Sequence, residues 1–247
     1  MKVVFHDDFY QIYTSDPAAA GGRLEPIVKA IKPHVTFVPA QPASEDDIAA
    51  VHTERHIESI KDSGLHEISA LAAGGALQAA TIGLEEPCFG LIRPPGHHAS
   101  SDSCWGFCFY NNMSVALHTL YRQKKIKSAF VLDFDLHYGD GNVNILSEKG
   151  YVTLFNPEEY NRNKYLHSVE KELNSCKADI IGISAGFDNH KNDWGDVLET
   201  EDYTTMGEMV KEAAKRNNGG YFAILEGGYN HSILGENVLA LIQGMER

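Results

Sequence analysis

The sequence predicts an α/β fold: an open, mostly parallel sheet with helices on both faces, forming a single domain over residues 1–247. Two observations predict it. Apolar strand candidates alternate with helical stretches along the chain, which is the pattern of a parallel sheet covered on both sides. Several strand candidates end in polar residues, as expected where a site lies beyond the carboxyl ends of parallel strands. No linker, repeat or low-complexity segment divides the chain.

The strand candidates are short apolar runs bounded by polar or turn residues. In chain order they are residues 3–5, 35–38, 88–92, 129–134, 151–155, 179–184 and 221–225. The helix candidates show helical periodicity or a start signal. They are residues 23–31, a start at 44–47, 55–61, the Ala- and Gly-rich stretch 68–82, 111–122, a start at 143–147, 164–175, 200–216 and 232–245.

Composition narrows the class of protein. A formal net charge of −13 argues against direct binding of nucleic acid. We find neither a signal-peptide pattern nor an apolar run long enough to cross a membrane. The four cysteines match no zinc-ribbon or redox spacing, so we expect free thiols in a cytoplasmic, reducing environment. The sequence does not exclude a homo-oligomer.

The strand candidate at 129–134 runs into a group of metal-type ligands. Asp133, Asp135 and His137 stand at alternating positions, so on a strand their side chains would point the same way. A carboxylate and an imidazole together suit zinc or another divalent first-row ion. Asp188, after a later strand candidate, supplies a third ligand. Three protein ligands leave one position for water, which is the arrangement of a catalytic zinc.

Other polar groups at strand ends supply acid–base chemistry. His97 and His98 follow a Pro-Pro-Gly turn and can exchange protons near neutral pH. Asp133 and Asp140 are spare carboxylates that can each orient an imidazole. Tyr229 follows Gly-Gly, where its hydroxyl can reach a developing oxyanion. Four polar clusters at four strand ends therefore predict one shared site.

Taken together, these residues resemble the zinc-dependent histone deacetylase superfamily, which includes the acetylpolyamine amidohydrolases. Five motifs carry the resemblance, in the order of the family. They are Arg93-Pro-Pro-Gly-His-His-Ala99, Gly106-Phe-Cys-Phe-Tyr-Asn-Asn112, Asp133-Phe-Asp-Leu-His-Tyr-Gly-Asp-Gly141, Ser184-Ala-Gly-Phe-Asp188 and Glu226-Gly-Gly-Tyr229. The resemblance implies the arginase/deacetylase fold and hydrolysis of a linear amide.

The resemblance also implies a role for each residue. Zn²⁺ would be held by Asp135, His137 and Asp188, and Tyr229 would bind the scissile carbonyl. His98 would be the general base and then the general acid.

Asp133 would hold His97, which is the electrostatic partner, and Asp140 would hold His98. Phe107 would form one aromatic wall of the acyl-lysine tunnel beside Gly106, with Cys108 near its foot. K⁺ often binds near Asp133 in the family, but the serine that completes its site is not found in residues 153–157, which leaves K⁺ doubtful.

Two departures concern the walls of the site. The glycine-rich loop that usually carries the second aromatic wall is missing from residues 156–165, and the amino-terminal loop is replaced by residues 16–24. We therefore expect a more open site, unless Tyr160, Tyr165 or a second subunit closes it. His52 and His56 stand one helical turn apart without a third ligand, so we expect surface histidines.

The expected substrate is an acylated lysine side chain or a small acyl amine such as an acetylpolyamine. Two alternatives stay open. An arginase-type ureohydrolase would use two manganese ions and would need more aspartates than the motifs supply. A non-catalytic relative would bind acylated ligands without turnover.

Overall fold

The computed structural model describes residues 1–246, and its centre is a seven-stranded sheet in which all strands are parallel. The strands, in chain order, are β1 (Lys2–Phe5), β2 (Thr36–Pro39), β3 (Cys88–Gly90), β4 (Ala129–Asp133), β5 (Val152–Phe155), β6 (Ile180–Ala185) and β7 (Gly220–Leu225). Their order across the sheet is β2-β1-β3-β7-β6-β4-β5. All seven strand candidates of the sequence are present, and the predicted α/β fold class is confirmed.

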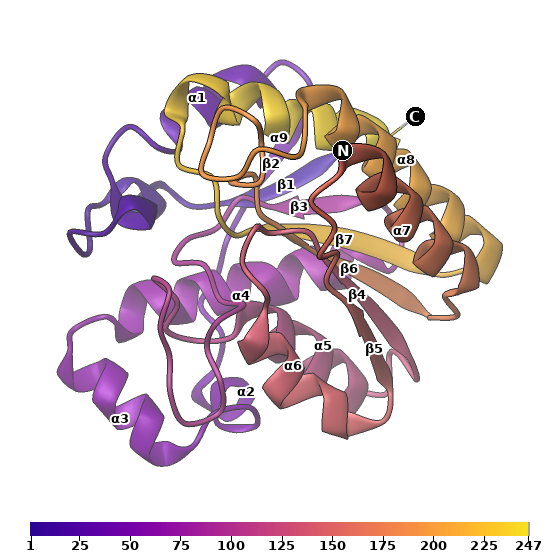
Figure 1. The fold of residues 1–247 in the computed structure, drawn as a ribbon. Coiled ribbons are helices and arrows are strands. Elements are labelled where there is room, and N and C mark those ends of the chain that lie inside the picture. Colours follow the sequence, from indigo (N-terminus) through magenta and orange to yellow (C-terminus); the bar gives the residue numbers. More distant parts are fainter. Residues whose placement is uncertain (247) are drawn as a thin grey trace.

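Helices cover the sheet on both faces (Figure 1). One face carries α1 (Glu25–Ile31), α7 (Arg162–Ser175), α8 (Thr200–Asn217) and α9 (His231–Glu246). The other carries α4 (His66–Gly83), α5 (Asn112–Arg122) and α6 (Asp140–Leu146), with the short α2 (Glu45–Ala49) and α3 (Glu54–Asp62) outside them. Within residues 1–246, no helix combines the length and the apolar character that crossing a bilayer requires.

The core lies between the sheet and these two helical layers. Every residue of β4 and β6 is buried, since both of their faces are covered. Helix α4 packs closely against its neighbours, as its Ala and Gly content predicts. At Gly74 a Cβ atom would collide with the backbone of residues 41–43, so a larger residue would push the helix away.

The topology brings the predicted polar clusters together. The four strands that precede them, β3, β7, β6 and β4, are direct neighbours in the middle of the sheet. Because the strands are parallel, their carboxyl ends lie at the same edge. Residues far apart in the sequence, such as His97 and Tyr229, therefore meet at that edge.

The central stretch differs in detail from the prediction. Strand β4 ends at Asp133, so Asp135 and His137 lie in the following loop and not on a strand. The loop brings them together by a side chain-to-backbone turn, because Asp135 Oδ1 accepts the N–H of His137 at 3.0 Å. Helix α6 begins at Asp140, which places that carboxylate in the first helical turn, earlier than predicted.

The prediction that His52 and His56 lie on the surface was wrong, because both are buried. His52 Nε2 accepts the N–H of Asn111 at 2.9 Å, and His56 Nε2 lies 2.8 Å from the carbonyl oxygen of Phe109. Their rings pack around Tyr110, with centroids 5.3 and 6.1 Å from its ring. His52 and His56 thus anchor the backbone at Phe109 and Asn111, just after the predicted pocket residues Gly106 and Phe107.

Candidate active site

Three predicted metal ligands converge at the edge of the sheet. His137 Nδ1 lies 3.2 Å from Asp135 Oδ1 and 3.0 Å from Asp188 Oδ2. One ligand atom from each residue lies within 4.8 Å of the others. Spacings near 3 Å are those of neighbouring ligands around one first-row ion, whose bonds are about 2.0–2.2 Å long. The donor set therefore fits a single divalent cation.

The surroundings of the three ligands also favour a cation. The other oxygen of each aspartate is held by the backbone, since Asp135 Oδ2 accepts the N–H of Gly227 and Asp188 Oδ1 accepts that of Leu136. Hydrogen bonds to the two carboxylates raise the pKa of His137 to about 10. The same negative field would attract a divalent ion in place of that proton.

His97 forms the inner histidine–carboxylate pair. Its Nδ1 lies 3.2 Å from Asp133 Oδ2, and both side chains are buried. Burial alone would lower the pKa of His97, but Asp135 and Asp133 outweigh it and raise the pKa well above the ordinary value. Asn142 Nδ2 donates to the same Asp133 oxygen at 3.1 Å, which fixes the carboxylate from the interior.

His98 forms the outer pair with Asp140. Its Nδ1–H donates to Asp140 Oδ1 at 2.7 Å, and its ring lies 4.0 Å from that of His97. Burial and the neighbouring His97 lower the pKa of His98 to about 4. Because the pKa of His97 is raised and that of His98 is lowered, the two adjacent histidines are suited to different roles, one as a cation and one as a base.

Tyr229 faces the same pocket from the loop after β7. Its ring stacks on Trp194 at 3.9 Å and meets Phe107 edge-on at 5.9 Å. Burial raises its pKa, so the hydroxyl stays protonated and can donate a hydrogen bond. Asp193 Oδ2 accepts the N–H groups of Tyr229 and Asn230 at 2.8 and 2.7 Å, which fixes the backbone of the loop.

The pocket between these groups has a volume of about 100 Å³. Its lining comprises Pro95, His97, His98, Trp105, Gly106, Phe107, His137, Trp194, Gly227 and Tyr229. The predicted wall residues Gly106 and Phe107 are among them. Gly106 has a φ of 58°, and a Cβ there would collide with the ring of His98, so glycine is required at this position.

Two tryptophans supply wall surface that the sequence did not predict, and the expectation of a more open site stays a prediction. Trp105 lies over His98, and Trp194 lies over Tyr229 and edge-on to Phe107 at 6.4 Å. Tyr160 is 94% exposed and Tyr165 is buried, and both line a different cavity of about 410 Å³. The sequence held one clue to these wall residues, namely their positions. Trp105 stands beside Gly106, and Trp194 stands six residues after Asp188.

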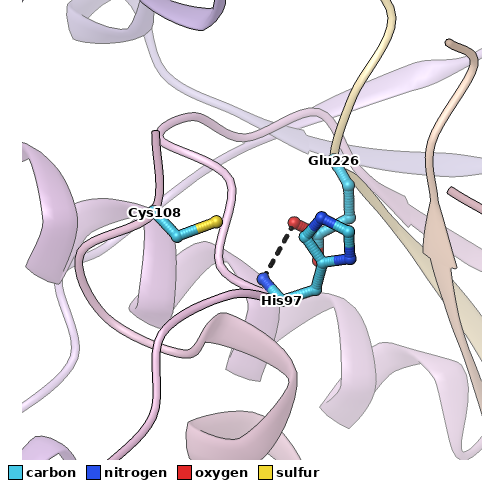
Figure 2. A group of neighbouring side chains, drawn as sticks. All are labelled: His97, Cys108 and Glu226. Carbon is cyan, nitrogen blue, oxygen red and sulfur yellow. Dashed lines mark hydrogen bonds between the residues drawn. The ribbon is translucent and has the colours of Figure 1, made fainter. Parts of the chain in front are cut away.

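Figure 2 shows a second group of side chains of the kind that bind metal ions, His97, Cys108 and Glu226. All three are buried. Glu226 Oε2 accepts the N–H groups of Gly96 and His97 at 2.7 and 3.3 Å. Cys108 Sγ accepts the N–H of His98 at 3.4 Å. Because backbone groups already engage the carboxylate and the thiol, we assign this cluster to holding the His97–His98 turn and not to a second metal.

Glu226 closes a circuit of hydrogen bonds around His97. Its Oε1 accepts from Ser184 Oγ at 3.2 Å, and Ser184 Oγ accepts from Asn142 Nδ2 at 3.1 Å. Asn142 reaches Asp133, which binds the His97 ring, while Glu226 binds the His97 backbone. No role for Glu226 followed from the sequence, although the residue stands directly before Gly227-Gly-Tyr229.

Comparisons with known proteins identify the family. Residues 62–165 and 156–245 match the family described as the histone deacetylase domain, and the chain belongs to this family. A probable deacetylase of Methanothermobacter thermautotrophicus is 27% identical over 99% of this chain and 90% of the relative. A probable deacetylase of Archaeoglobus fulgidus is 32% identical, covering 76% of this chain and 67% of the relative.

Two further comparisons agree with this assignment. A histone deacetylase-like amidohydrolase of Pseudomonas aeruginosa is 25% identical over 94% of this chain and 78% of its own length. The crystal structure of the HDA15 HD domain superposes with a TM-score of 0.85 at 21% identity, covering 98% of this chain and 88% of that one, which shows the shared fold. The chain is therefore an enzyme of the deacetylase type, a hydrolase acting on amides.

Proposed function

We propose that this enzyme removes an acetyl or other short acyl group from a lysine side chain or a small amine such as a polyamine, with Zn²⁺ as its metal. One observation carries the proposal. Two carboxylates and an imidazole, with ligand atoms within 4.8 Å of one another, lie beside two histidines that each have their own carboxylate. The narrow pocket above them favours an unbranched chain over a bulky substrate.

Asp135, His137 and Asp188 would hold the metal. A zinc ion at such ligands polarises a carbonyl and lowers the pKa of water to about 7. We propose no K⁺ site, because residues 153–157 contain no serine.

The proton transfers are assigned to His98. Its Nδ1–H is committed to Asp140, so Nε2 is the free nitrogen and can accept the proton of the attacking water. His98 then returns a proton to the leaving amine. His97, held by Asp133 and kept cationic, stabilises the negative charge that develops during attack.

Tyr229 and Phe107 act on the substrate. The Tyr229 hydroxyl donates to the carbonyl oxygen as it becomes an oxyanion. Phe107 and Gly106 would form one wall for the methylene chain of the amine, and Trp194, in edge-on contact with Phe107, also lines the pocket. The pocket lining contains no Asp, Glu, Lys or Arg, so we expect the width of the pocket to select the substrate.

The test combines metal analysis with substrate screening. The purified protein should contain one zinc ion per chain and hydrolyse fluorogenic acetyl-lysine peptides or acetylpolyamines, assayed side by side with longer acyl amides. Two manganese ions with urea release would indicate a ureohydrolase. Binding of acylated ligands without turnover of any substrate would reject the proposed reaction.

A further inference from the structure

The indole of Trp105 contacts both members of the outer histidine–carboxylate pair. Its Nε1–H donates to Asp140 Oδ2 at 2.9 Å, while Asp140 Oδ1 accepts from His98 at 2.7 Å. Its ring lies on the His98 ring, with centroids 3.9 Å apart and planes 33° apart. One side chain therefore binds the carboxylate and covers the imidazole.

The outer pair needs such support because it lies at the solvent side of the site. The Asp140 side chain is 36% exposed, whereas that of Asp133 in the inner pair is fully buried. Asn142 holds Asp133 from the interior by donating to the oxygen that faces His97. Trp105 donates to the second oxygen of Asp140, so it supports the carboxylate of the outer pair as Asn142 supports that of the inner pair.

The backbone is shaped to put Trp105 there. Gly106 and Phe107 both have left-handed φ values, 58° and 67°, and the second is unusual for a residue with a side chain. The turn directs Trp105 onto His98 and Phe107 toward Tyr229. The same three residues thus supply a support for the base and a wall for the substrate.

We propose that Trp105 is a positioning residue for His98: it holds Asp140 in its hydrogen bond to Nδ1 and keeps the imidazole facing the pocket. The inference rests on the proposed function, in which His98 transfers the protons. Without the indole, water can compete for Asp140, and the His98 ring can rotate on its open side. The result is a slower chemical step with little change in substrate binding.

The first experiment measures kcat and KM of the zinc-loaded enzyme with an acetyl-lysine peptide. Trp105→Ala removes the hydrogen bond and the stacked ring, and Trp105→Phe removes the hydrogen bond alone. We expect kcat to fall at least thirtyfold in Trp105→Ala and by a smaller factor in Trp105→Phe, with KM within threefold of wild type. A fall below threefold in Trp105→Ala, or a change confined to KM, would make Trp105 a simple wall and overturn the inference.

A second experiment tests the route through Asp140. In an Asp140→Asn background, Trp105→Phe should lower kcat less than threefold, because its partner is already altered. An equal cost in both backgrounds would show that Trp105 acts independently of Asp140 and would contradict the inference.

A third experiment reads the contact without turnover. The chain has two tryptophans, so a ¹⁵N-labelled sample shows two indole N–H signals, which Trp194→Phe assigns. Asp140→Asn should shift the Trp105 signal, and an unchanged signal would refute the contact.

The matched control is Tyr121→Ala, which removes another half-exposed stacked ring, located on α5 against Tyr151 and outside the pocket. It should keep the wild-type kcat. Absence of turnover in the wild-type protein would reject the proposed function, while full activity of Trp105→Ala beside an active wild type would reject this inference alone.

Discussion

At the scale of single residues, each group that the proposed reaction uses is held in place by a second residue. Asp133 and Asp140 hold the histidine rings, Glu226 holds the backbone of the histidine turn, and Asp193 holds that of Tyr229. Such partners restrict the rotation of the reactive groups, so little reorganisation is needed during the reaction.

Tyr229→Phe removes one hydroxyl from the pocket and leaves the ring stacked on Trp194. We expect kcat to fall about 100- to 1,000-fold, the usual cost of losing one oxyanion donor. Zinc content by elemental analysis should be unchanged, because Tyr229 is not among the three ligands. Activity near the wild-type level would remove Tyr229 from the mechanism.

Glu226 gives a prediction about stability. Glu226→Ala leaves the buried N–H groups of Gly96 and His97 without an acceptor, at about 1–3 kcal/mol each. We expect unfolding in urea to show a loss of about 3 kcal/mol. Burial raises the pKa of Glu226 to about 7, so near neutral pH the carboxyl is partly protonated. A neutral side chain of the same shape therefore resembles its protonated form.

Glu226→Gln is therefore the matched control, since its carbonyl oxygen can accept the same two N–H groups. It should lose no more than about 1 kcal/mol. Equal losses in the two variants would show that the negative charge, and not the acceptor, is what the fold requires.

At the scale of elements, the pocket loop is anchored where helix α5 begins. Asn111 caps that helix by accepting the N–H of Ser114 at 2.8 Å, and its own N–H is bound by His52 from the turn between α2 and α3. The segment that carries Trp105 and Phe107 therefore ends at a fixed point. Because the bond needs an unprotonated Nε2, the anchor depends on pH.

Burial, aided by the nearby His56, lowers the pKa of His52 from 6.5 to about 3 in the folded protein. At a pH between these two values, His52 is protonated in the unfolded chain but not in the folded chain. The contribution to stability is thus complete above pH 6.5 and is lost as the pH falls toward 3. We expect a loss of about 2 kcal/mol between pH 7 and pH 5.

The measurement is urea unfolding at both pH values for the wild type and for His52→Gln, whose amide oxygen can accept the same N–H without titrating. The variant should lose about 2 kcal/mol less than the wild type over this interval. Identical pH dependence would mean that His52 is not the responsible group.

At the scale of the whole molecule, two neighbouring strands, β4 and β6, bring the three proposed metal ligands together, so binding of an ion would be coupled to the fold. Zinc at about 1,000 times its Kd should stabilise the protein by roughly 4 kcal/mol. For a chain of 247 residues this raises Tm by roughly 10 °C. The measurement is thermal unfolding of metal-free protein with and without added zinc.

Asp188→Ala is the informative variant, because it removes one ligand from a buried position on the loop after β6. Its Tm should not respond to the same zinc concentration, and the variant should show no turnover. A wild-type response in this variant would place the ion elsewhere.

The features that could be predicted from the sequence were those that follow a repeated pattern along the chain. Alternation of strands and helices indicates the sheet, and Asp133, Asp188 and Tyr229 attract notice because each stands at or just after a strand end. The unpredicted part depends on loop conformation. The direction of Trp105 follows from two left-handed residues, and that of Trp194 from the bonds of Asp193 to the next loop. Neither loop conformation produces a periodic pattern in the sequence. The burial of His52 and His56 was missed for the same reason, because both bind the backbone of the loop at Phe109 and Asn111.

Strand β7 lies between β3 and β6, although it is the last strand in the chain. During synthesis on a ribosome, the amino-terminal strands and the β4–β6 unit emerge first, with a gap between them that only residues 220–225 fill. Until residues 220–225 emerge, β3 and β6 of the nascent chain therefore each have an unpaired edge, and the site lacks Glu226 and Tyr229. On the proposed mechanism, turnover would have to wait until β7 has paired with both of its neighbours and Tyr229 has reached the pocket.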